Sequence, residues 1–86
     1  MRTVATIPHP QLKISIFLYN EKYIIEIEAA QYKQTFKISQ DSVNGPEDVK
    51  KLCSDELING CMQRFSGMHA DFKKAYEQLN SNNHVS

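Results

Sequence analysis

The feature that most constrains this chain is an apolar stripe that runs through residues 54–80 with a seven-residue period. Three heptad positions carry the stripe, and their members are Ile58, Phe65, Phe72 and Leu79; Cys61, Met68 and Ala75; and Met62, His69 and Tyr76. These positions are neighbours on an α-helix, so they form one continuous face that has to be covered. We therefore expect a long amphipathic helix, and the rest of the chain must supply the surface opposite it.

Two glycines leave open whether residues 54–80 form one helix or two. Gly60 and Gly67 each cost about 1 kcal/mol relative to alanine in a helix interior, and Ser66-Gly67 could also end a first helix. The stripe keeps its phase across Gly67. We therefore favour one helix that is kinked at this glycine.

A shorter helix should precede the long one. Pro46 suits a first helical position, and it is followed by two acidic residues that complement the helix dipole. We expect this helix to end near Leu52 or Cys53, because Ser54 followed by two acids is a second start signal. The chain should therefore bend between a short helix and a long one.

The first half of the chain alternates between apolar and polar residues, as half-buried strands do. Three such runs lie within residues 12–38, separated by Asn20-Glu21 and Ala30-Gln31, and they predict an antiparallel meander. A two-residue turn at Asn20-Glu21 would make the apolar and charged residues of the first two strands match across the ladder. The predicted pairs are Leu18 with Tyr23, Ile16 with Ile25, Ile14 with Ile27, Lys13 with Glu28, and Phe17 with Ile24.

The third strand is less well defined by its sequence. Lys33 can lie opposite Glu28 or Glu26, depending on the turn that precedes it. Gln34 falls on the inner, apolar face, so it needs either a position at the sheet edge or a hydrogen-bond partner.

Residues 1–11 are interpreted as an extended lead-in. Pro8 and Pro10 push the residues before them toward extended geometry, so no helix should cross this point. Residues 4–7 could add an edge strand or lie across the sheet. We interpret His9, held between the prolines, as a solvated linker residue rather than as a ligand or base.

Together these elements predict a single α+β domain over residues 1–86. Its parts are the lead-in (1–11), a three-stranded antiparallel β-meander (12–38), a short helix and a long C-terminal helix packed on one sheet face (46–80), and a frayed tail (81–86).

The long helix exceeds the sheet that it must cover. Its 27 residues extend about 40 Å, whereas a strand of eight residues extends about 26 Å. The overhang carries Phe72, Tyr76 and Leu79, which would be exposed to water in an isolated chain, so we expect a homodimer. Gly67 lies on another side of this helix, where it could admit a second helix closely or only allow a kink.

The outer face of the sheet is a second candidate surface. Phe17 and Ile24 are paired, apolar and rimmed by charge, as in an interface core, unless the lead-in covers them. The same face also carries Lys13, Lys22, Lys33, Lys37 and Tyr19. Such a face could bind single-stranded nucleic acid by stacking and charge, although Glu26 and Glu28 interrupt it.

No constellation of residues for catalysis or metal binding emerges. Cys53, Cys61 and His69 are evenly spaced by eight. Along one helix, however, neighbours in this series lie about 12 Å apart, whereas zinc ligands converge on one ion. No serine-hydrolase, metalloprotease or phosphate-loop motif occurs. We therefore expect no enzyme, no metal and no cofactor, with both cysteines reduced.

The net charge and the hydropathy of the chain limit the partners and the cellular location that we expect for it. The 10 basic and 10 acidic residues cancel, so the chain has no broad attraction to nucleic acid or anionic membrane. No apolar run approaches the roughly 20 residues that span a bilayer, and the N-terminus does not resemble a signal peptide. We therefore expect a cytoplasmic, non-enzymatic protein-interaction module that is homodimeric. The alternative is a single-stranded nucleic-acid-binding module that uses the outer sheet face.

Three segments resemble a family of small uncharacterised bacterial proteins. They are Ile7-Pro8-His9-Pro10, the hairpin Tyr19–Glu28 and the helical run Gln63–Met68. The resemblance extends over nearly the whole chain. It implies a bacterial, soluble protein and carries no known activity or site.

Overall fold

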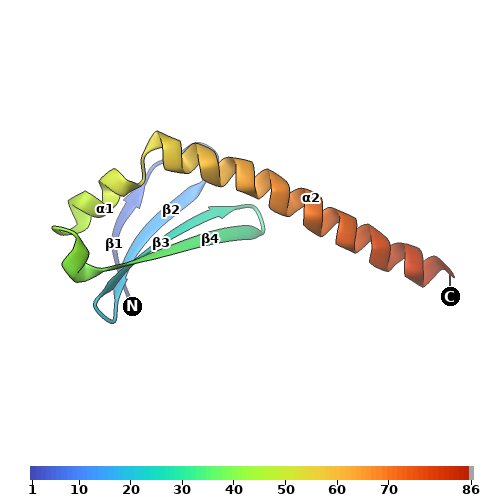
Figure 1. Cartoon of the computed structure of the whole chain (residues 1–86), viewed down its shortest axis with the longest axis horizontal. Coiled ribbons are helices and arrows are strands. Elements are labelled where there is room, and N and C mark those ends of the chain that lie inside the picture. Colours follow the sequence, from blue (N-terminus) through green and yellow to red (C-terminus); the bar gives the residue numbers. More distant parts are fainter. Residues whose placement is uncertain (86) are drawn as a thin grey trace.

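The fold combines one antiparallel sheet with two helices, seen in a computed structural model that describes residues 1–85, with side chains to residue 79. Its strands lie side by side in chain order (Figure 1). The elements are β1 (Arg2–Ile7), β2 (Lys13–Tyr19), β3 (Lys22–Ala29), β4 (Tyr32–Ser39), a 3₁₀ turn (Gln40–Ser42), α1 (Pro46–Leu52) and α2 (Asp55–Val85).

The sheet has four strands, so the prediction of three was wrong. The segment treated as a lead-in forms β1, which pairs antiparallel with β2 and sets Ile7 opposite Ile14. Of the two placements left open for residues 4–7, the edge strand is the one observed. A bulge between Thr3 and Ala5 shifts the register of β1, and such a shift breaks the period-two alternation by which a strand is recognised.

His9 has a structural role in the connection between β1 and β2. Its Nδ1 accepts hydrogen bonds from the backbone N–H groups of Gln11, at 3.1 Å, and Leu12, at 3.2 Å. The half-buried imidazole therefore orders the loop after Pro10 instead of serving as a solvated linker.

The central hairpin has the predicted register. Ile16 lies opposite Ile25 and Lys13 opposite Glu28. Asn20 and Glu21 both have positive φ, at 51° and 62°, as a type I′ turn requires. Asparagine tolerates this backbone conformation well, whereas for glutamate it is uncommon.

The register of β4, left open by the sequence, places Lys33 close to both Glu28 and Glu26. Lys33 lies directly opposite Glu28 in the ladder. Its Nζ lies 3.5 Å from the Oε1 of Glu26, which is the diagonal neighbour on the same face. The preceding turn is tight, with Ala29 opposite Tyr32 and a positive φ of 54° at Ala30.

The helical half begins as predicted, and α2 is a single helix through both glycines. Pro46 occupies the first turn of α1, whose Val49 is fully buried. Ser54 caps α2 by accepting a hydrogen bond at its Oγ from the backbone N–H of Leu57, at 3.2 Å. The helix ends at Val85. The frayed tail was expected at 81–86, and the side chains of these residues lie outside the described part of the chain.

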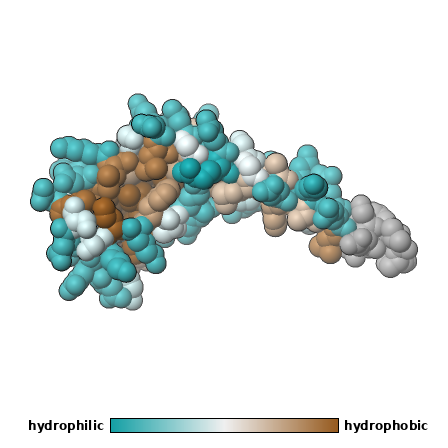
Figure 2. Space-filling model, viewed as in Figure 1, coloured by the Kyte–Doolittle hydropathy of each residue, from teal (hydrophilic) through white to brown (hydrophobic). Residues whose placement is uncertain are grey.

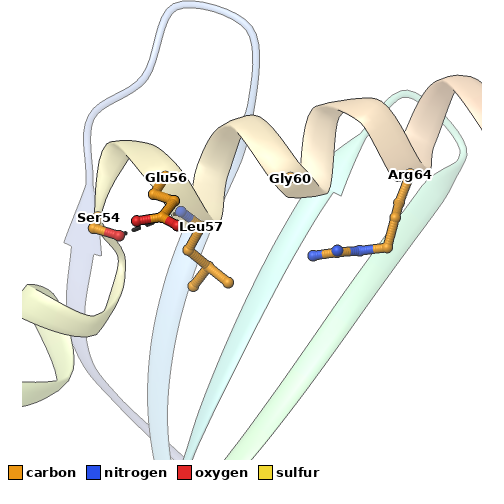
Figure 3. A pocket seen from close by; sticks show the side chains of 5 residues that line it. All are labelled: Ser54, Glu56, Leu57, Gly60 and Arg64. Atoms are coloured by element: carbon orange, nitrogen blue, oxygen red, sulfur yellow. Dashed lines mark hydrogen bonds between the residues drawn. The ribbon is translucent and has the colours of Figure 1, made fainter.

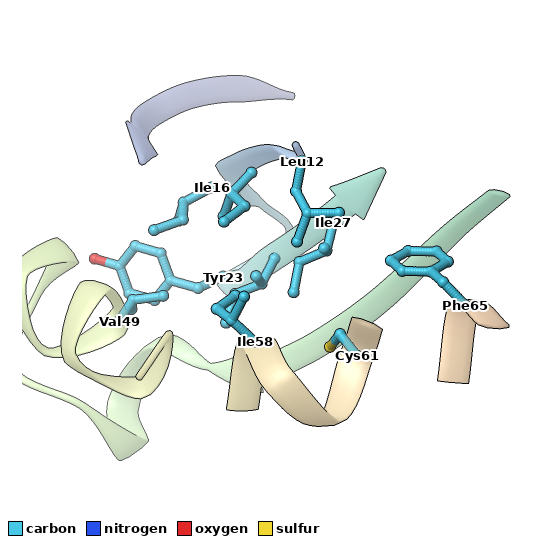
Figure 4. Packing of buried hydrophobic residues seen from close by; sticks show 10 residues of the cluster. Leu12, Ile16, Tyr23, Ile27, Val49, Ile58, Cys61 and Phe65 are labelled. Carbon is cyan, nitrogen blue, oxygen red and sulfur yellow. The ribbon is translucent and has the colours of Figure 1, made fainter. Parts of the chain in front are cut away.

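The core lies between the inner face of the sheet and the first half of α2 (Figure 4). Ile58, Cys61 and Phe65 project from α2 into it, and Ile16 and Ile27 of the sheet are fully buried there. Beyond this region α2 continues past the β3–β4 turn, away from the sheet (Figure 1). Within the described residues, no helix combines the length and the apolar composition that a bilayer crossing requires.

Candidate functional site

The overhanging part of α2 carries an exposed apolar ridge made of Phe72, Tyr76 and Leu79. These side chains are 54%, 58% and 56% exposed. Phe72 and Leu79 occupy the same heptad position as Ile58 and Phe65, which are buried against the sheet. The stripe is therefore continuous along α2, but only its first half is covered by the chain itself.

Tyr32 joins the base of the ridge to the β3–β4 turn. Its ring packs edge-on against His69 and Phe72, with centroid separations of 6.0 Å and 6.3 Å. Its hydroxyl also lies 3.1 Å from the Nδ1 of His69. A shallow hollow lies on each side of the Tyr32–Phe72 contact, one bordered by Asp71 and the other by Lys73. The ridge is therefore flanked by opposite charges.

A second apolar surface, not predicted from the sequence, lies at the other end of the sheet's inner face. We call it the β4 groove. It is lined by Ile25, Phe36, Ile38, Leu52 and Leu57. Leu52, the last residue of α1, is 43% exposed. Figure 2 shows hydrophobic atoms gathered below the junction of α1 and α2.

The outer face of the sheet brings Phe17 and Ile24 together but leaves little of Ile24 open. Ile24 is only 8% exposed, and Phe17 is half-buried. β1 lies beside β2 rather than over this face, so the lead-in does not cover the pair. Ile24 is instead flanked in the ladder by Phe17 and Lys37, and side chains on the sheet itself account for its burial.

Gly67 lies apart from the apolar ridge. It is exposed, and a Cβ built on it would meet no atom within 4 Å. No other segment among the described residues therefore approaches it closely. The structure groups Phe72, Tyr76 and Leu79 on the overhang and leaves Gly67, Phe17 and Ile24 elsewhere.

The first turns of α2 border a shallow pocket beside Arg64, whose side chain lies along the helix past Gly60 (Figure 3). Two donors of this guanidinium are engaged within the chain. Nε donates to the Oε1 of Gln34 at 2.9 Å, and one terminal nitrogen lies 3.4 Å from the Sγ of Cys61. Arg64 therefore acts here as a structural link between α2 and β4.

The cysteines are free thiols near the bend between the helices. Cys61 is fully buried, and Cys53 is half-buried at the end of α1. Burial, with a smaller contribution from the nearby Cys61, raises the pKa of the Cys53 thiol above its ordinary value. Cys53 is thus held in its protonated, poorly nucleophilic form at neutral pH. Among the described residues, no three His, Cys, Asp or Glu side chains converge as a metal site would require.

A scan against protein-family models gives no match, and searches of the curated proteins and of the solved structures give none either. The resemblance to small bacterial proteins therefore stays a prediction. The function is inferred from the chain's own surfaces.

Proposed function

We propose that this protein is a non-enzymatic interaction module that forms a homodimer through the apolar ridge of α2. The observation that carries the proposal is the exposure of Phe72, Tyr76 and Leu79, each more than half open to water. Large side chains scattered singly on a surface need no explanation, but a contiguous apolar row of them is typical of an association site.

The position of the ridge supports this proposal. Phe72 and Leu79 continue the heptad position that buries Ile58 and Phe65, so the sequence maintains apolar residues beyond the edge of the sheet. An isolated helix gains little stability in water without a covered apolar face. A second copy that covers the ridge would stabilise both the helix and the small domain.

The test is a charge placed on the ridge. Phe72→Glu should shift the protein from dimer to monomer in sedimentation velocity at micromolar concentration, because association would bury an unpaired carboxylate. Leu79→Glu makes the same change two turns further along α2, away from Tyr32. Both variants should keep the far-UV circular dichroism of the parent.

The matched control is Ala70→Glu, which adds the same charge to an exposed site on another side of α2. This variant should remain dimeric. A parent chain that is monomeric at every concentration, or ridge variants that dimerise like the parent, would contradict the proposal.

Single-stranded nucleic-acid binding is a second candidate, favoured by one observation on the outer sheet face. Tyr19 is 51% exposed and lies directly opposite Lys22, next to the Asn20-Glu21 turn of the central hairpin. A base could stack on this ring while a phosphate approaches the lysine. If so, Tyr19→Ala should weaken oligonucleotide binding, and the affinity should fall steeply with salt.

A further inference from the structure

We infer that the apolar ridge of one copy docks into the β4 groove of a second copy, so that two copies exchange their overhanging helices reciprocally. This inference rests on the proposed function and deepens it by naming the surface that receives the ridge. It assigns a role to the exposed side chain of Leu52, which the core of a single chain does not cover.

The two surfaces are complementary in shape. The ridge is a row of exposed side chains on an overhanging helix, whereas the groove is a concavity lined by strand and helix residues. Leu52 at its rim is 43% exposed, and Phe36, Ile38 and Leu57 are only half-buried. An inserted helix would cover aliphatic and aromatic side chains that the chain leaves open, and it would shield part of the neighbouring β4 edge.

The charges beside the two surfaces also match. Asp71 and Lys73 flank the ridge on opposite sides. Lys37 borders the groove on β4. Glu56 borders the adjoining pocket, which shares Leu57 with the groove and also contains Arg64, whose Nε is engaged by Gln34. Of the two directions in which a helix can lie in the groove, one places Asp71 beside Lys37 and Lys73 on the side of Glu56. Such complementarity selects the orientation of a partner.

Pairing of ridge with ridge fits the charges less well. A parallel arrangement would bring the two sheets into the same space, because each sheet covers the first half of its own stripe. In an antiparallel pair related by a two-fold axis, the same flank of both helices lies on the same side. Asp71 then faces the Asp71 flank of the second copy and gains no basic partner like Lys37 there. The Lys73 flank, in contrast, also carries Glu77 one turn further along and can form an opposite pair.

The test combines one ridge variant with one groove variant. Phe72→Glu and Leu52→Glu should each weaken dimerisation at least tenfold in sedimentation equilibrium, because each places a carboxylate in the same apolar contact. Tyr19→Glu is the control, since it adds the same charge at another large exposed aromatic side chain. This control should dimerise like the parent.

Mixing the two variants separates docking from misfolding. Homodimers of either variant contain no intact contact, but a mixed dimer joins the unaltered ridge of one chain to the unaltered groove of the other. An equimolar mixture should therefore dimerise more strongly than either variant alone. A charge exchange gives an independent readout: Lys37→Glu and Asp71→Lys should each weaken association about two- to five-fold, and the double variant should recover it.

Three outcomes would overturn the inference. If Leu52→Glu dimerises like the parent while Phe72→Glu is monomeric, the ridge pairs with another ridge, and only the proposed function survives. If the mixture of variants stays monomeric, the groove is not the receptor of the ridge. If the parent forms open-ended assemblies instead of a dimer, the contact does not close reciprocally. A monomeric parent would instead remove the proposed function itself.

Discussion

Gln34 and Cys61 are joined by a hydrogen bond that fixes α2 to the edge strand. The Nε2 of Gln34 donates to the backbone carbonyl oxygen of Cys61 at 2.9 Å, while its Oε1 accepts from the Nε of Arg64 at the same distance. The side chain that breaks the apolar pattern of β4 is therefore satisfied at both ends. This link sets the point from which α2 leaves the sheet.

Removing the link should destabilise the protein. Gln34→Ala should lower the free energy of unfolding by about 1–2 kcal/mol, because it removes the two hydrogen bonds that join the side chain of this β4 residue to α2. Urea denaturation measures this change. Gln40→Ala, at an exposed side chain in the loop after β4, should change stability by less than about 0.5 kcal/mol. Equal effects of the two substitutions would mean that the link contributes nothing.

Shortening an isoleucine should cost more unfolding free energy in the interior of the sheet than on its edge strand. Ile27 is fully buried, so Ile27→Val should cost about 0.5–1.5 kcal/mol in unfolding free energy. Ile7 on the edge strand β1 is only half-buried, so Ile7→Val should cost less. If the edge substitution proves the more damaging of the two in chemical denaturation, the core is not where the structure places it.

The hairpin turn offers a stabilising substitution. Glu21 has a φ of 62°, where a side chain is strained and glycine is not. Glu21→Gly creates an Asn-Gly turn, and we expect it to raise the unfolding free energy by about 0.5 kcal/mol, since relief of strain exceeds the added entropy of the unfolded chain. Lys22→Gly, in the following strand, should be destabilising. A loss of stability in both variants would contradict the turn geometry.

The raised pKa of Cys53 predicts a specific pH dependence. Because burial favours the neutral thiol in the folded state, the stabilising contribution of this thiol is fully present below the unfolded pKa and is lost as pH rises through the folded pKa. Alkylation of Cys53 by iodoacetamide at pH 8 should be slower in the folded chain than in urea and should accelerate at higher pH.

The control for this labelling is Cys53→Ser. This variant retains only Cys61, which is fully buried and should stay unmodified until the chain unfolds. Equal alkylation rates for Cys53 in buffer and in urea would show that the thiol is not shielded by the bend between α1 and α2.

Local pattern was sufficient for much of the fold, and it failed where the pattern was interrupted. The register of Ile16 with Ile25 follows from alternation and a two-residue turn, and the phase of the stripe across Gly67 is what a single long helix requires. β1 was left as one of two alternatives for residues 4–7, and was not counted among the strands, because its bulge between Thr3 and Ala5 shifts the alternation by one residue. A period-two pattern cannot reveal a strand that changes phase within six residues.

The candidate surfaces also divide into those that the sequence predicts and those that only the folded structure shows. The exposure of Phe72 follows from comparing the length of a helix with that of a strand, which needs no tertiary information. The openness of Leu52 and the burial of Ile24 depend instead on the path of α2 and on neighbours across the sheet. These are properties of the assembled layers, so the β4 groove could not be read from local sequence.

The central claim is that a second copy covers the apolar ridge, and sedimentation equilibrium of the unaltered chain tests it most directly. One chain has a mass of 9.9 kDa. We predict that the fitted mass rises from this value toward twice it as the concentration increases through the micromolar range, and that Phe72→Glu stays at the lower mass. A fitted mass of a single chain at every concentration would contradict the account.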